Sequence, residues 1–246
     1  MRGQTWQRRR RLAAGYDSAV HAGPVVRVGA RLLWGYDVSR AWAEIGEVAH
    51  AAPGSTVLDL PSGGGIALRG LRPGQRIRYV AADISPVMLA RVRARARMQV
   101  RARAGARRRK RSGGPRSARE LGLVQASIAA LPFPDRTFDL CLSYNGLHCF
   151  PEPAAAVQEY ARILRPGGVL RGTTIIAGTG RWHDAVTWAL RQVGAFGRPF
   201  QLGELAAWLR AAGFDSVRIT RCGAVATFAA HRASPEAGAI DPERLR

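Results

Sequence analysis

The nine residues Val57–Gly65 constrain the fold of this chain more than any other stretch. They form a short apolar run of β-type residues that carries an acidic residue near its end and breaks into three consecutive glycines. Glycine lets the backbone turn sharply and approach a ligand closely, so the pattern is typical of a buried strand that leads into a ligand-binding turn. It predicts an α/β fold whose ligand lies at the end of this strand.

Apolar runs alternate with helical patterns along the rest of the chain. Strands are expected at residues 56–60, 77–82, 123–126, 138–143, 169–176, 214–220 and 224–231. Helices are expected at residues 17–34, 37–51, 153–164, 183–194 and 202–212, with two more that begin near 66 and 86. This alternation indicates a doubly wound, mostly parallel sheet preceded by N-terminal helices. The short connection Cys222-Gly223 indicates one antiparallel hairpin at the end.

The formal net charge of +21 is concentrated in two segments. Residues 1–11 contain five arginines and residues 91–119 contain thirteen Lys or Arg, with no acidic residue in either segment. The rest of the chain has a net charge of only +3. The charge therefore belongs to a basic tail and to a basic insert of about residues 98–117. Gly105 is expected to end the helix before it, and residues 106–117 are expected to form a loop.

The spacing of the cysteines and the hydropathy of the chain predict the cellular compartment of the protein. Cys141, Cys149 and Cys222 show neither zinc-ligand nor C-x-x-C spacing, which predicts free thiols, no metal site and a cytoplasmic protein. No apolar run approaches the length of about 18 residues that a membrane span needs. The first arginines are not followed by the apolar segment of a signal peptide. Neither a membrane span nor a cleaved signal is expected.

Two acidic residues narrow the ligand of the glycine turn. Asp83 ends the next strand, where an acid is suited to a ribose hydroxyl. The dinucleotide fingerprint G-x-G-x-x-G, read from Gly63, would need glycine at the position of Leu68. The turn holds no arginine or lysine for a pyrophosphate, whereas Asp59 is suited to the cationic amino-acid end of S-adenosylmethionine. The residues therefore favour S-adenosylmethionine over a dinucleotide.

With these motifs the chain resembles the class I S-adenosylmethionine-dependent methyltransferases. Within this class it is similar to the methyltransferase type 11-like proteins, which act on small molecules. Val57–Gly65 resembles their first motif, and Ala82–Leu89 resembles the ribose-binding second motif. Residues 130–140 and 164–168 resemble the segments before the fourth and fifth strands. The resemblance implies a Rossmann-like, seven-stranded sheet of order 3-2-1-4-5-7-6 with the last strand antiparallel. The expected methyltransferase domain is 53–232, between a tail and helical cap at 1–52 and a C-terminal tail at 233–246.

The resemblance also implies which residues bind the cofactor. The candidates are Asp59, Pro61, Ser62, Gly63, Gly65, Asp83, Ile84, Ser127, Ile128 and Asn145. Pro61 stands where the motif has its first glycine, so one backbone donor is lost. Ser127 stands where many relatives have an aspartate, although its hydroxyl can still accept a hydrogen bond from the adenine amino group. Both departures are expected to change cofactor affinity and not the fold.

Methyl transfer from a sulfonium is an in-line displacement, so alignment of nucleophile and methyl group can supply much of the rate. His148 is the candidate general base, with a hydrogen-bonded structural role as the alternative. The turn Ser143–Gly146 lacks the proline typical of base-amino methyltransferases, which favours a small, apolar or lipid-like acceptor. Four rings are expected to cover this acceptor or, equally, to lie in the core: Trp182, Trp188, Phe196 and Phe200.

The basic tail and insert keep a second hypothesis open. They are compatible with a nucleic-acid-binding or RNA-modifying protein, although a nucleic acid is the less favoured partner. The acceptor atom and the oligomeric state are left open by the sequence.

Overall fold

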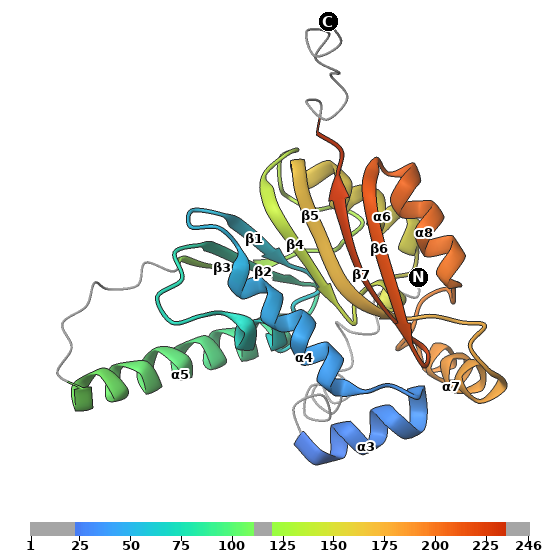
Figure 1. Cartoon of the computed structure of the whole chain (residues 1–246), viewed down its shortest axis with the longest axis horizontal. Coiled ribbons are helices and arrows are strands. Elements are labelled where there is room, and N and C mark those ends of the chain that lie inside the picture. The colour runs from blue at the N-terminus through green and yellow to red at the C-terminus, as the bar shows by residue number, and fades with distance from the viewer. Residues whose placement is uncertain (1–22, 111–119, 235–246) are drawn as a thin grey trace, which may run out of the picture.

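The predicted strands pair into one seven-stranded sheet in a computed structural model, which describes residues 23–110 and 120–234 (Figure 1). The strands are β1 (Thr56–Asp59), β2 (Arg78–Asp83), β3 (Glu120–Gln125), β4 (Phe138–Tyr144), β5 (Leu164–Ile175), β6 (Phe214–Cys222) and β7 (Val225–Arg232). Their order is β3-β2-β1-β4-β5-β7-β6, and β7 is antiparallel to both β5 and β6. The remaining neighbours pair in parallel. The predicted fold class and strand order are confirmed.

Helices bury both faces of the sheet, as expected for parallel strands. On one face lie α4 (Val38–Gly46), the 3-10 turns η2 (Glu47–His50) and η3 (Ile66–Gly70), and α5 (Pro86–Lys110). On the other face lie α6 (Pro153–Ile163) and α8 (Leu202–Ala211). Successive side chains of β1 point to opposite faces of the sheet. Val57 therefore packs on the face covered by α4 and α5, and Leu58 packs on the face covered by α6 and α8.

Two further helices lie beyond the carboxyl ends of β4 and β5 (Figure 1). They are α3 (Gly23–Trp34) and α7 (Arg181–Gln192), and the indole N–H of Trp182 donates to the Leu32 carbonyl over 3.2 Å. The Trp34 ring stacks on Phe196 with a centroid distance of 6.0 Å. These helices form a cap over the edge at which a parallel sheet binds ligands. Residues 17–22 of the first expected helix lie outside the described residues.

The prediction that Gly105 ends the helix was wrong, because α5 continues through Gly105 to Lys110. Alanine and arginine are strong helix formers, and one internal glycine costs only about 1 kcal/mol relative to alanine. The expected loop at 106–117 is therefore helical up to Lys110, and residues 111–117 lie outside the described part of the chain. No helix in the described ranges is both long and apolar enough to cross a membrane.

The segment 164–168, expected to lie before the fifth strand, falls within the bounds of β5. Leu164 pairs with Phe138, the register then shifts, and regular pairing with β4 resumes at Val169, as the resemblance implies. Gly167 has a φ of +74°, so the chain still needs a glycine at this irregularity. The predicted helix 37–51 is likewise divided into α4 and the 3-10 turn η2.

Candidate functional site

The sheet brings the ends of β1, β2 and β4 together at one edge. Asp59 ends β1 and Asp83 ends β2, which pair in parallel, and β4 lies on the other side of β1. The glycine turn is hydrogen-bonded between these strands. The Ser62 amide donates to the Ala82 carbonyl over 2.9 Å, and the Leu60 amide donates to the Leu142 carbonyl over 3.0 Å. The turn is therefore fixed on both sides by neighbouring strands.

Asp83 connects the end of β2 to this turn. Its Oδ2 accepts a 2.8 Å hydrogen bond from the Gly63 amide, and its Oδ1 accepts one of 2.8 Å from the Ser85 amide. The side chain is buried, which raises its pKa to about 6, while the backbone hydrogen bonds oppose the shift. A carboxylate oxygen has two lone pairs, so each oxygen can still accept one hydroxyl. Asp83 can thus hold the turn and bind a diol at the same time.

Asp59 is more deeply buried and has a partner that the sequence analysis missed. Its Oδ2 accepts a 2.6 Å hydrogen bond from the Tyr79 hydroxyl. Burial raises the pKa of Asp59 to about 7; the hydrogen bond from Tyr79 lowers it, and the charge of Asp83 raises it further. The only sequence signal for this pair is a tyrosine within the apolar run of the neighbouring strand. Asp59 is therefore a carboxyl group whose charge can change near neutral pH.

The glycines of the turn adopt conformations that other residues avoid. Gly63 and Gly65 have φ values of +49° and +85°. A Cβ atom on Gly65 would lie 3.1 Å from Leu68 Cδ1, whereas nothing lies within 4 Å of the Cβ position of Gly63. The carbonyl of Gly64 accepts a hydrogen bond from Arg95 of α5, a second contact that the sequence did not reveal. The turn is thus packed closely at Gly65 and open at Gly63.

Pro61 and Ser62 fit a site for a polar ligand. Pro61, which follows a cis peptide bond, lies against the turn after β4, because a Cβ atom on Gly146 would be 2.4 Å from Pro61 Cδ. The Ser62 hydroxyl is buried and has no hydrogen-bond partner within residues 23–110 and 120–234. A buried hydroxyl without a partner is uncommon in a native protein and is often satisfied by a ligand or water. Together with the Asp83 oxygens, it offers hydrogen bonds to a nucleoside cofactor.

The other candidate cofactor residues surround the same edge. Asn145 follows β4 with a φ of +53°, and its Oδ1 accepts a 3.1 Å hydrogen bond from the Thr173 hydroxyl. The Ala126 amide donates to the Asp83 carbonyl over 3.2 Å, which places the segment that contains Ser127 beside the end of β2. Ser127 Oγ accepts from the Ala129 amide over 3.3 Å. The two apolar candidates, half-buried Ile84 and buried Ile128, follow β2 and β3.

His148 lies in η4 (Leu147–Cys149) and is buried. Its Nδ1 accepts a 3.1 Å hydrogen bond from the Ile175 amide. A backbone amide only donates, so in the neutral ring the proton is on Nε2. Burial lowers the pKa of His148 to about 3, and its ring packs edge-on against Phe196 at 4.5 Å. These contacts favour the structural alternative over a general base.

The four rings expected near the acceptor lie in three different environments. Phe200 is in the main core with Trp208, to which its ring centroid is 5.1 Å away. Phe196 packs in the cap beneath α3. Trp182 and Trp188 are about 60% and 63% exposed on α7. The core alternative therefore holds for Phe200, and among these four rings Phe196 is the one buried in the cap.

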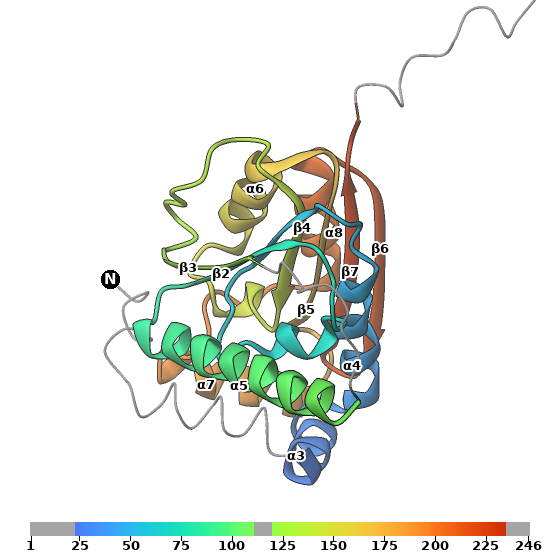
Figure 2. The same cartoon turned by 90° about the vertical axis from the view of Figure 1, so that its left-hand side faces the viewer.

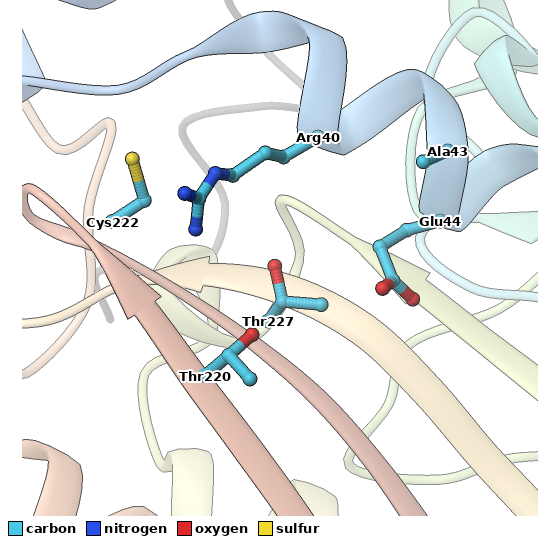
Figure 3. Close-up of a pocket in the computed structure, with 6 residues that line it drawn as sticks. All are labelled: Arg40, Ala43, Glu44, Thr220, Cys222 and Thr227. Atoms are coloured by element: carbon cyan, nitrogen blue, oxygen red, sulfur yellow. The ribbon is translucent and has the colours of Figure 1, made fainter.

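A separate pocket of about 250 Å³ lies between α4 and the β6–β7 hairpin (Figure 3). It is lined by Arg40, Ala43, Glu44, Thr220, Cys222 and Thr227. Figure 3 shows the Arg40 side chain extending toward Cys222 and the Glu44 carboxylate pointing from α4 toward the strands. None of the predicted site residues lines this pocket, so it is distinct from the glycine turn.

Comparisons with known proteins agree with the fold and the motifs. A family described as "Methyltransferase domain" matches residues 58–171. A ubiquinone/menaquinone biosynthesis C-methyltransferase, UbiE of Shewanella frigidimarina, is 35% identical over 126 residues, which cover 50% of this chain and 44% of that protein. The chain spans less than half the length of the curated relatives it matches first.

Solved structures show the same architecture at low identity. The YcgJ protein of Bacillus subtilis superposes with a TM-score of 0.63 at 14% identity and covers 80% of this chain and 99% of its own. The [4+2]-cyclase SpnF gives a TM-score of 0.58 at 21% identity, over 79% of this chain and 80% of that chain. The strand order, the glycine turn with its two acids and the family match lead to one conclusion. Together, these findings support a class I S-adenosylmethionine-dependent methyltransferase, whose domain family matches residues 58–171.

Proposed function

We propose that this chain transfers a methyl group from S-adenosylmethionine to a small, apolar or lipid-like acceptor by in-line displacement. The observation that carries the proposal is the buried Asp83 carboxylate, which holds the Gly63 amide and keeps acceptor capacity on both oxygens. When bound, the cofactor supplies an electrophilic methyl group on a sulfonium. Asp83 would bind the ribose hydroxyls, and the turn Ser62–Gly65 with Asp59 would hold the methionine end. Ile84, Ser127 and Ile128 would contact the adenine.

The cap supports an apolar acceptor. Buried Tyr36 and Phe196 and the partly buried Trp34 belong to one apolar cluster of the cap, which would present aromatic surface to the acceptor. Apolar walls bind an apolar acceptor and exclude water from the reacting atoms. The names of two similar proteins, a ubiquinone/menaquinone biosynthesis C-methyltransferase and the CurJ carbon methyltransferase, are compatible with such an acceptor. The carbon, oxygen or nitrogen centre that is methylated is left to experiment.

Calorimetry with S-adenosylmethionine and S-adenosylhomocysteine tests the cofactor, and we expect both to bind. The fold alone does not fix the reaction, because one structural neighbour is named a cyclase. A metabolite extract should therefore be incubated with the protein and a methyl-labelled donor, with Asp83→Asn as the inactive control. Label in a small, extractable product supports the proposal. Absence of cofactor binding by the wild-type protein contradicts it.

Replacement of His148 by Ala is expected to lower thermal stability and to leave the pH dependence of turnover unchanged. The variant leaves the buried Ile175 amide without its 3.1 Å partner, which costs about 1–3 kcal/mol. Because the pKa of His148 is about 3, the ring is neutral over the working pH range in the wild-type protein as well. Thermal melts and pH–rate profiles with saturating cofactor measure both effects.

Thr174→Val is a matched control, since it removes the hydroxyl 3.2 Å from His148 Nδ1 and keeps the bond from Ile175. A loss of turnover of about 100-fold or more in His148→Ala, together with the loss of a titration step, would instead identify His148 as a general base.

A further inference from the structure

The longest helix in the described part of the chain, α5, carries a segment whose charge is entirely positive. Between Arg91 and Lys110, helix α5 contains ten arginine or lysine residues and no acidic residue. Four of these ten residues, Arg107–Lys110, were expected in a loop, but the backbone is helical as far as Lys110. We call Arg91–Lys110 the basic arm.

The basic arm is anchored at its first half. Val92 is fully buried against the sheet, and Gln99 donates a 3.1 Å hydrogen bond from its side chain to the Leu68 carbonyl. Beyond this point the helix leaves the sheet, since Met98 and Val100 are 67% and 66% exposed. The far end of α5 extends past β1–β3 in Figure 1, and Figure 2 shows the helix lying across the side of the molecule turned toward the viewer. The arm is therefore a projection fixed to the domain.

The spacing of the charges on the arm is close to that of a nucleic acid backbone. Its 20 residues extend about 30 Å at about 1.5 Å per residue, so ten charges give about one per 3 Å. A nucleic acid strand carries one phosphate per about 3.4 Å. Like charges four residues apart destabilise a helix by about 0.2–0.5 kcal/mol per pair, and no acid offsets them within the arm. A polyanion bound along the arm would reduce this repulsion.

The distribution of side chains favours a nucleic acid over a lipid surface. The exposed side chains of Arg93, Arg97 and Arg101 follow one another at helical spacing on one side of the helix. Exposed Met98 and Val100 are two positions apart and point in different directions, so they form no continuous apolar face. A helix that lies in a membrane surface needs such a face. Arginine, the residue that dominates the arm, binds phosphate through two parallel N–H donors.

We propose that the basic arm binds the phosphodiester backbone of a nucleic acid independently of base sequence, through the exposed face that carries Arg93, Arg97 and Arg101. Arg95 lies on a different side of the helix and donates a hydrogen bond to the Gly64 carbonyl of the cofactor turn. The proposal goes beyond methyl transfer to a small acceptor. The arm would localise the protein on a nucleic acid and takes no part in the methyl transfer itself.

Fluorescence anisotropy with a labelled single-stranded RNA, measured over a range of salt concentrations, tests the proposal on the full chain. In the triple variant Arg93→Gln, Arg97→Gln, Arg101→Gln, we expect the slope of log K against log salt to become shallower by about two, since each lost phosphate contact on a single strand contributes about 0.7. Glutamine is also a strong helix former, so the helix should be retained. Circular dichroism verifies this.

The matched control removes the same charge elsewhere: Arg76→Gln, Arg210→Gln, Arg218→Gln, all exposed in the structure. Its slope should equal that of the wild-type protein. Equal slopes in the two triple variants would overturn the proposal. So would an arm variant that loses binding to vesicles of anionic phospholipid but keeps its affinity for RNA. S-adenosylmethionine binding should be unchanged in the arm variant, which separates this test from that of the methyltransferase activity.

Discussion

Asp83→Asn is expected to weaken S-adenosylmethionine binding by about 100-fold or more, since two charge-assisted hydrogen bonds at about 1.5–3 kcal/mol each would be lost or weakened. The amide group that replaces one oxygen is a donor. It would face the Gly63 amide or the Ser85 amide, both of which are donors at 2.8 Å. The turn would therefore lose its connection to β2 as well as the acceptor for a ribose hydroxyl.

Isothermal titration with the cofactor measures the effect, and Asp139→Asn is the matched control. Asp139 Oδ2 accepts a 2.7 Å hydrogen bond from the Thr56 amide, and Oδ1 forms an ion pair with Arg165. This carboxylate therefore has a similar local role, but it lies near the start of β4, at the opposite edge of the sheet. The control should lose stability and keep its cofactor affinity. Wild-type affinity in Asp83→Asn would show that this residue does not bind the ribose.

The sequence predicted best those features that depend on residues close together along the chain. A strand, a glycine turn and an acid at the next strand end lie within about 30 residues, and the pattern predicted that they meet at one edge of the sheet. The hydrogen bond from the Gly63 amide to Asp83 lies at that edge, but the bond itself was not predicted. The strand order came from the resemblance and was confirmed. The helix end predicted at Gly105 was wrong, because a local breaker signal was outweighed by the helix propensity of the alanines and arginines around it.

Features that depend on distant partners could not be predicted. The proton position on His148 is set by the Ile175 amide, 27 residues away on β5. The charge state of Asp59 depends on burial and on Tyr79, which becomes its neighbour only when β1 and β2 pair. Pattern analysis identifies the residue types that can carry out a reaction. The pKa values and hydrogen-bond directions that decide their roles come from the tertiary structure.

The pH dependence of cofactor binding is the second large effect, and it arises from Asp59. Burial raises the pKa of this carboxyl group to about 7, so it is neutral below that pH and anionic above it. If it binds the cationic end of S-adenosylmethionine, affinity should fall about tenfold per pH unit below pH 7 and reach a plateau above it. The free energy of unfolding of the cofactor-free protein should show the opposite trend. The folded state holds this proton more tightly than the unfolded chain, so the contribution of Asp59 to stability is lost as the pH rises from about 4 through 7.

Two variants distinguish the titration of Asp59 from that of Asp83, because the pKa of Asp83, about 6, is close to the pKa of Asp59. Asp59→Asn should show low affinity at every pH and keep only the titration step near pH 6. Tyr79→Phe removes the 2.6 Å hydrogen bond that holds the pKa of Asp59 down, so the midpoint of the affinity curve should move to higher pH. The high-pH plateau should be retained, because the carboxylate itself is still present. An affinity that does not change with pH in the wild-type protein, or a midpoint unmoved in Tyr79→Phe, would mean that the Asp59 charge does not contact the cofactor. The turn would then hold the methionine end through its backbone and the Ser62 hydroxyl alone.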